Sequence, residues 1–292
     1  MWDLYKDSTL GKETLNNWTP LESFPNEEYA NEVKDSSIID NLKNSELNRY
    51  IIESTVNFHQ LRFDYLRSRY DFSKENIREL YSKWIQNGLS IDKFVIFPPN
   101  DPTFWIRTIK GLSNLFYHLF PDYFFPYKFD AEFNKLTNIC LEFNIPIPEI
   151  PKKSDWLKRA FYYLNLCDAF FEFRKTTGLT PSEFCAFLYD FAPKNLNEIN
   201  DTQMPNPSKV WFVGGSKFDF NFLDNATESS ISRWQCNIDT RRGDIIIMYC
   251  VAPRSYIHSI WRAQSDGFLD PFFQYFNSGY ISSPLKLNYK IS

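Results

Sequence analysis

The chain changes its hydrophobic periodicity once, across a polar connection over residues 193–208. Before this connection, apolar side chains recur at the three- and four-residue spacing of amphipathic helices. After it, short apolar runs bounded by turn residues have the pattern of β-strands. The connection is rich in Asn, Pro, Gln and Thr, a composition typical of a linker. The sequence therefore predicts an α+β protein, with an N-terminal all-α domain at residues 44–192 and a C-terminal β domain at residues 209–292.

Helix-start signals support the helical domain. The run Thr180-Pro-Ser-Glu183 has the form of a capping box with proline at the first helical position. Residues 1–43 are polar and weakly patterned, and we expect a flexible arm or an irregular wrapping there. The other segments expected to be helical are residues 50–70, the segments capped by Ser73, Asp101 and Asp130, and the longest helix, from Ser154 to Gly178.

Three runs in the β domain are expected to form strands, at residues 210–213, 245–251 and 256–262. The second run is almost continuously apolar, as expected of a strand buried on both faces. The polar stretch at residues 226–232 is expected to be helical. The tripeptide Arg242-Gly243-Asp244 precedes the second run. Glycine permits a tight turn and Asp244 can bond nearby backbone, so we interpret the tripeptide as a turn that begins a strand rather than an adhesion motif.

Composition narrows the class of protein. The formal charge of −4 argues against a general polyanion binder, although residues 207–292 are mildly basic, which favours a specific pocket over an electrostatic clamp. Aromatic residues make up 18% of the chain, so a single aromatic residue is weak evidence for a site. The five cysteines include no CxxC pair, which favours reduced thiols. The sequence shows no signal-peptide pattern at its start and no apolar run long enough to span a membrane. We therefore predict a cytoplasmic protein with no membrane contact.

Known catalytic patterns are missing from the sequence. The three histidines, His59, His118 and His258, lie far apart and have no carboxylates at metal-ligand spacing. A nuclease-like pair, Pro121-Asp122 and Glu132-Phe-Asn-Lys135, has one residue too many for the usual Glu-x-Lys metal site. We therefore expect no catalytic residue, metal ligand or cofactor site that these motifs would identify.

Taken together, the order of features in the last third of the chain resembles the EVE domain, a member of the PUA-like superfamily related to YTH domains. The residues that carry the resemblance are Trp211 opening the first strand, Trp234 before a polar turn, Gly243-Asp244 before the apolar strand, and the strand at 257–263. The resemblance covers about residues 207–292 and implies a PUA-like β-barrel. EVE domains normally continue with further strands that close the barrel. We therefore expect a truncated barrel, or one completed by another segment, or a gene product that extends beyond Ser292.

The resemblance also implies a pocket for a flat base. In such relatives a Trp at the position of Trp234 forms a wall of the pocket, and a purely structural role in the core is the alternative for this residue. An aromatic face replaces the stacking that a flipped base loses. The other implied base-binding residues are Gly214, Gly215, Ser216, Asn237 and Trp211, although a core role is the more natural one for Trp211. The implied phosphate contacts are Lys217, Arg241, Arg242 and Arg254.

Three functions follow, from different classes. The first is a non-enzymatic reader of modified nucleobases in DNA or RNA, with restriction or phage defence as the setting that the family suggests. The second is a protein–protein interaction or scaffold module, in which the helical domain recruits a protein partner. The third is a nuclease-type defence enzyme, with its active site in the helical region or on a partner.

Overall fold

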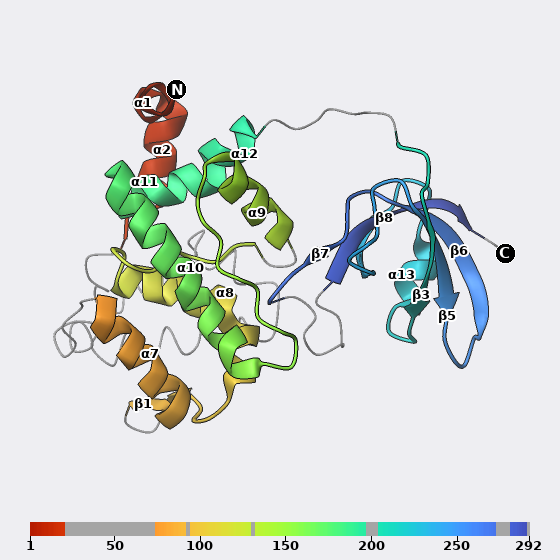
Figure 1. The fold of residues 1–292 in the computed structure, drawn as a ribbon, viewed down its shortest axis with the longest axis horizontal. Coiled ribbons are helices and arrows are strands. Elements are labelled where there is room, and N and C mark those ends of the chain that lie inside the picture. The colour runs from red at the N-terminus through yellow and green to blue at the C-terminus, as the bar shows by residue number, and fades with distance from the viewer. Residues whose placement is uncertain (21–73, 92–93, 130–131, 197–203, 273–280, 291–292) are drawn as a thin grey trace, which may run out of the picture. The chain divides into compact units, whose positions relative to one another are not determined.

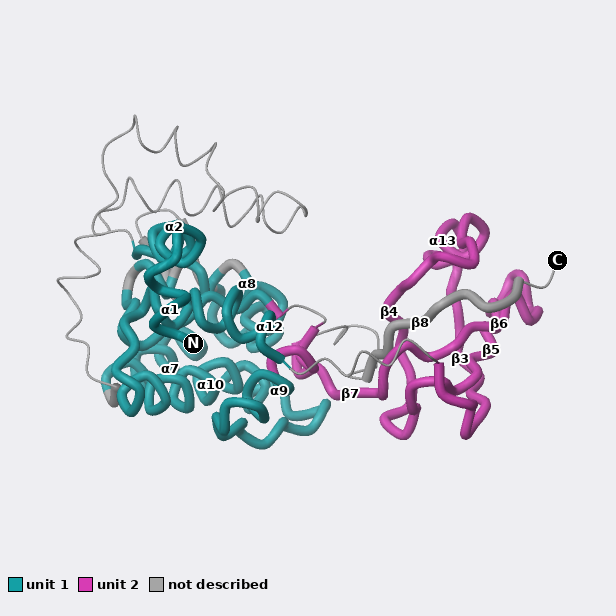
Figure 2. The backbone as a smooth tube through the Cα atoms, turned by 90° about the horizontal axis from the view of Figure 1, so that it is seen from above, with its two compact units in different colours: residues 1–128, 137–196 teal, residues 129–136, 197–292 magenta. Residues whose placement is uncertain are grey.

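The computed structural model describes residues 1–20, 74–91, 94–129, 132–196, 204–272 and 281–290. The helix expected over residues 50–70 and the caps expected at Ser73 and Asp130 lie outside this part of the chain. The chain divides into two compact units, which Figure 2 shows in different colours. Unit 1 comprises Met1–Lys128 and Thr137–Leu196, and unit 2 comprises Phe129–Leu136 and Asn197–Ser292.

Unit 1 is built from helices (Figure 1). In chain order they are α1 (Trp2–Asp7), α2 (Thr9–Asn17), α7 (Lys74–Asn87), α8 (Pro102–Leu119), α9 (Phe133–Glu142), α10 (Trp156–Thr177), α11 (Pro181–Ala186), the π-helix η1 (Phe187–Phe191) and α12 (Ala192–Asn195). Helix α9 spans the division between the units. The strands β1 (Leu89–Ile91) and β2 (Phe94–Phe97) pair antiparallel between α7 and α8.

The helix ends follow local sequence. The capping box at Thr180 and Glu183 is confirmed, because each side chain accepts a hydrogen bond from the backbone N–H of the other residue. Asp101 caps α8 as predicted and accepts from the N–H of Phe104 at 2.9 Å. The cap of α10 is Asp155 rather than Ser154, because its carboxylate accepts from the Lys158 N–H at 3.1 Å.

Aromatic rings fill the core of unit 1. Tyr81 and Trp105 have ring centroids 4.7 Å apart, and Phe125 and Phe170 meet edge to face at 4.7 Å. Such pairs add stability beyond their buried area. The helical spacing of these aromatic residues therefore reflects their packing in the core.

The first part of the polar N-terminal segment is helical, as α1 and α2, and packs against α11 and η1 of the same unit. The ring of Trp2 lies edge-on to Phe191, with centroids 5.1 Å apart. The Tyr5 hydroxyl donates to Asp190 at 2.8 Å, and Lys6 pairs with Glu183 at 3.1 Å. These few anchoring side chains could not be recognised in the sequence, because the segment is mostly polar.

Unit 2 contains a mixed sheet in the order β3 (Val210–Gly215), β5 (Ile245–Cys250), β6 (Tyr256–Ala263), β8 (Ile281–Lys290) and β4 (Ile231–Gln235), with β7 (Phe268–Leu269) paired to β8. Strand β3 runs parallel to β5, and the other pairings are antiparallel. The α+β class is therefore observed. Among the described residues, no backbone pairing closes this sheet into a barrel.

Two local expectations for unit 2 are wrong. The helix lies earlier than predicted, as α13 (Phe220–Asn225), and residues 231 and 232 belong to β4. Pairing with β8 outweighs the weak helical preference of this polar segment. Strand β5 is buried on one face only, since residues 245, 247 and 249 are half-buried. The buried face joins a core of Leu223, Ile246, Met248, Cys250, Trp261 and Ala263.

A short segment from the helical half of the sequence belongs to unit 2. Phe133 is buried, and its ring meets that of Phe272 with centroids 6.5 Å apart. Glu132 bonds Arg233 of β4 and also pairs with Lys135 at 2.9 Å. Contacts of this range could not be inferred from local patterns.

No helix in the described ranges is long and apolar enough to cross a membrane.

Candidate functional site

Trp234 lies near the end of β4, and its indole reaches the opposite edge of the sheet. The indole Nε1–H donates to the carbonyl oxygen of Gly214 in β3, with an N···O distance of 3.1 Å. Strands β3 and β4 stand at the two ends of the strand order, so this bond joins the two edges. Two of the predicted base-binding positions therefore lie side by side, although 20 residues separate them in the sequence.

The Trp234 indole is half-buried against the core of unit 2. The ring centroids of Trp234 and Phe222, a residue of α13, lie 6.4 Å apart. The Phe222 ring also stacks on the buried Trp261 ring, with centroids 6.1 Å apart. A Cβ atom added at Gly215 would lie 3.6 Å from the Trp234 ring and 2.8 Å from Leu223 Cδ1. Glycine at this position therefore leaves room for the Leu223 side chain of α13, while the indole would be in ordinary van der Waals contact. Trp234 combines a packing role with a partly exposed aromatic surface.

The turn after β3 is closed by a carboxylate. The backbone N–H and the hydroxyl of Ser216 both donate to Asp219 Oδ2 at 2.7 Å. The N–H group that the family resemblance assigns to a base edge is thus bonded to Asp219. Lys217 and Phe218 occupy the exposed middle of the turn, with the Lys217 ammonium 5.2 Å from the Phe218 ring centroid.

Trp211 has a structural partner, the carboxylate of Asp244. The Trp211 indole Nε1–H donates to Asp244 Oδ2 at 2.9 Å, and the ring packs against the core of unit 2. Asp244 is fully buried and also accepts bonds from the N–H and hydroxyl of Ser208 and from the N–H groups of Lys209 and Arg241, at 2.7–3.0 Å.

The five donors around Asp244 decide its charge state. Burial alone would raise the pKa of this carboxyl, but the bonds from Arg241, Trp211, Ser208 and Lys209 outweigh burial and hold the pKa well below its usual range. The Arg-Gly-Asp tripeptide is therefore a buried structural turn, with Gly243 at a positive φ of 95°. A Cβ at Gly243 would meet the Pro205 carbonyl oxygen at 2.6 Å.

The remaining polar candidates gather on the turn between β4 and β5. The side-chain oxygen of Asn237 accepts from the Asp239 N–H at 2.9 Å, which stabilises the turn. The Arg241 guanidinium is exposed and bonds the carbonyls of Ile238 and Thr240 at 3.1 Å. The Arg242 N–H donates to Asp266 at 2.8 Å. These bonds tie the three residues to their own turn and to Asp266.

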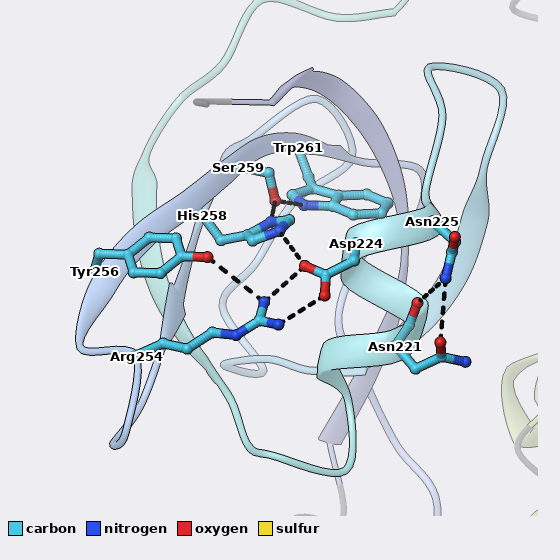
Figure 3. A network of polar contacts seen from close by, with 8 residues as sticks. All are labelled: Asn221, Asp224, Asn225, Arg254, Tyr256, His258, Ser259 and Trp261. Carbon is cyan, nitrogen blue, oxygen red and sulfur yellow. Dashed lines mark hydrogen bonds and ion pairs between the residues drawn. The ribbon is translucent and has the colours of Figure 1, made fainter.

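Arg254 lies between β5 and β6 and is held by Asp224 of α13 (Figure 3). The guanidinium donates to both carboxylate oxygens at 2.6 and 2.7 Å, and it lies 4.1 Å from the Phe220 ring centroid. These bonds hold the pKa of Asp224 down to about 2. The predicted phosphate contact therefore has an internal carboxylate partner. Asp224 lies 30 residues from Arg254, so no local spacing signals the pair.

His258 also contacts Asp224, in an order that resembles a catalytic triad (Figure 3). His258 Nε2 lies 3.3 Å from Asp224 Oδ1, and Nδ1 lies 3.0 Å from the Ser259 hydroxyl oxygen. That hydroxyl is fully buried and accepts a bond from Trp261 Nε1 at 2.6 Å. A nucleophile must reach its substrate, so this arrangement is structural. No group of three or more His, Cys, Asp or Glu in the described residues could hold a metal ion.

Comparisons with protein-family models, with curated proteins and with solved structures find no match for this chain.

Proposed function

We propose that residues 209–292 form a PUA-like domain that reads a modified nucleobase in DNA or RNA, with Trp234 as a wall of the pocket. The bond from Trp234 to Gly214 carries the proposal, because it brings the expected aromatic wall and the expected backbone edge together. It also links the two edges of the sheet, as a curled, barrel-like sheet requires. The resemblance suggests restriction or phage defence as the setting.

The chemistry of the cluster formed by Trp234 and Gly214 suits a flat ligand. A base that leaves its stack loses contacts on both faces, and an aromatic side chain restores roughly 1–3 kcal/mol per base. The Gly214 carbonyl oxygen accepts one bond from Trp234 and keeps a second lone pair, which suits an exocyclic amino group on a base. Gly214 is exposed, and its lack of a side chain leaves the backbone there open to close approach.

Three cations of unit 2 are the proposed contacts for the flanking phosphates. Lys217 and Arg241 are exposed and lie on the turns after β3 and β4. Arg254 becomes a phosphate ligand when it exchanges its carboxylate partner Asp224 for a phosphate oxygen. Few cations are involved, so base contacts rather than charge must supply much of the affinity.

Titration with oligonucleotides tests this function. Purified full-length protein is titrated with labelled strands and duplexes that carry methylated or hydroxymethylated cytosine, against unmodified controls, and anisotropy gives the affinity. We expect tighter binding to at least one modified oligonucleotide and loss of that preference in Trp234→Ala. The matched control is Trp156→Ala, which removes another half-buried indole, from α10 of unit 1. An unchanged affinity of Trp234→Ala for every oligonucleotide would show that the pocket assignment is wrong.

A protein-docking role is the second candidate, and one observation favours it. Val210 and Phe212 of the edge strand β3 are 55% and 67% exposed, which is unusual for adjacent apolar positions on one strand face. If this face binds a protein, Phe212→Ala abolishes capture of that protein and leaves nucleic-acid affinity unchanged.

A further inference from the structure

The turn from Ser216 to Asp219 presents an exposed phenylalanine. Phe218 is 85% exposed, and apart from Met1 no large hydrophobic side chain in the described residues is as exposed. An aromatic ring in water forgoes the free energy that burial would give it. Phe218 makes no packing contribution that would explain this position.

Hydrogen bonds fix the backbone of the turn that carries Phe218. The Asp219 carboxylate accepts two bonds from Ser216, and the Asp219 N–H donates back to the Ser216 carbonyl at 2.9 Å. The turn then runs directly into α13, whose Leu223 N–H donates to the Asp219 carbonyl at 2.9 Å. Its other end is Gly215, which lies against Trp234.

We infer that Phe218 is a wedge that enters a DNA duplex beside the base held at Trp234, and that double-stranded DNA is therefore the substrate class. The inference rests on the proposed function. A base that leaves a duplex opens a gap between its neighbours, and an inserted apolar side chain fills such a gap. Lys217 lies beside the ring and provides a cation for the adjacent phosphate. A single strand has no stack of paired bases to reopen, so the wedge matters little there.

The test compares one sequence as a duplex and as a single strand, each with a central 5-hydroxymethylcytosine or 5-methylcytosine. Anisotropy titrations use the full-length wild type, Phe218→Ala and Phe218→Trp. The matched control is Phe212→Ala, another exposed phenylalanine of unit 2. We expect Phe218→Ala to weaken duplex binding about tenfold and single-strand binding less than about twofold, as expected for the loss of one stacking contact. Phe218→Trp restores the duplex affinity.

The outcomes distinguish failure of the Phe218 wedge from failure of the proposed base-reading function. If binding depends on Trp234 but Phe218→Ala binds the duplex as tightly as wild type, the wedge is refuted and the reader stands. Equal losses for duplex and single strand also refute it, because they indicate simple stacking on a single strand. If the wild type binds none of the four oligonucleotides, or binds them independently of Trp234, the proposed function and the wedge fail together.

Discussion

The indole Nε1–H of Trp211 donates to the buried carboxylate of Asp244 at 2.9 Å, and this bond joins two residues 33 positions apart. The same carboxylate collects four further bonds from the chain around it. The turn before β5 is thus anchored to the start of β3, the strand that carries Gly214. We therefore expect the stability of unit 2 to depend on this carboxylate.

Replacing the carboxylate by an amide tests the anchor. In Asp244→Asn the charge is lost and the new NH2 group faces donors, so buried donors lose their acceptor. We expect a loss of about 3–5 kcal/mol in the free energy of unfolding of unit 2. Urea denaturation followed by circular dichroism measures it. The control is Asp239→Asn, an exposed neighbour on the same turn, with an expected change below about 0.5 kcal/mol. Equal stability of the two variants would contradict the structural role.

The depressed pKa of Asp244 predicts a pH dependence. The folded-state pKa is lowered below the unfolded value of about 3.9, so the folded state favours the ionised form. This contribution to stability is complete above about pH 5 and is lost as pH falls below about 4, toward the folded pKa. Unfolding free energies measured across this range should converge for wild type and Asp244→Asn as the pH falls. A constant difference between the two would show that ionisation of this carboxyl contributes nothing.

The ion pair between Asp224 and Arg254 predicts a gain in binding. Asp224→Asn removes a negative charge and frees the guanidinium for phosphate, and we expect affinity for an oligonucleotide to rise. The salt dependence should steepen by about one unit in the slope of log K against log salt, because one more phosphate contact forms. Titrations between about 50 and 200 mM salt measure both effects.

Two further variants define this result. Arg254→Ala should lower affinity only slightly in wild type, but it should cancel the gain when combined with Asp224→Asn. Asn225→Asp serves as a control for charge on α13, since Asn225 bonds only Asn221 among the contacts shown in Figure 3. If Asp224→Asn binds no more tightly than wild type, Arg254 is not a phosphate contact.

The N-terminal helices predict a stabilising role for a segment that looks like a polar tail. Trp2→Ala removes ring contacts with Phe187 and Phe191, and we expect unit 1 to lose about 1–3 kcal/mol. Thermal unfolding compares it with Leu4→Ala, because Leu4 is 77% exposed on the same helix. Equal melting temperatures for the two variants would mean that α1 does not contribute to the fold.

Local chemistry accounts for the features that the sequence predicted well. The box at Thr180 and the cap of α8 depend on residues within one turn of each other, so their spacing is visible in the chain. The helical core could also be predicted from the three- and four-residue spacing of apolar side chains. The turn role of Asp244 could be predicted from Gly243 and the apolar run, although its partner Trp211 could not.

Tertiary contacts account for what the sequence did not reveal. In the sequence, Arg254 has no carboxylate at a spacing that signals an ion pair. Asp224 pairs with it because α13 packs on the sheet. Residues 231 and 232 form a strand because β8 supplies a partner. The exposure of Phe218 depends on a turn closed by Asp219, and the placement of Trp234 beside Gly214 depends on how the sheet brings its edges together.

The most direct test of the central claim is the ratio of affinities for modified and unmodified oligonucleotide in Trp234→Phe and Trp234→Leu. Both variants remove the bond to Gly214 and keep an apolar side chain, but only phenylalanine can stack on a base. We predict that Trp234→Phe keeps most of the wild-type ratio and that Trp234→Leu loses it, with modified-base binding weakened by about 1–3 kcal/mol. Equal ratios in wild type and Trp234→Leu would contradict the assignment of Trp234 as the wall of the pocket.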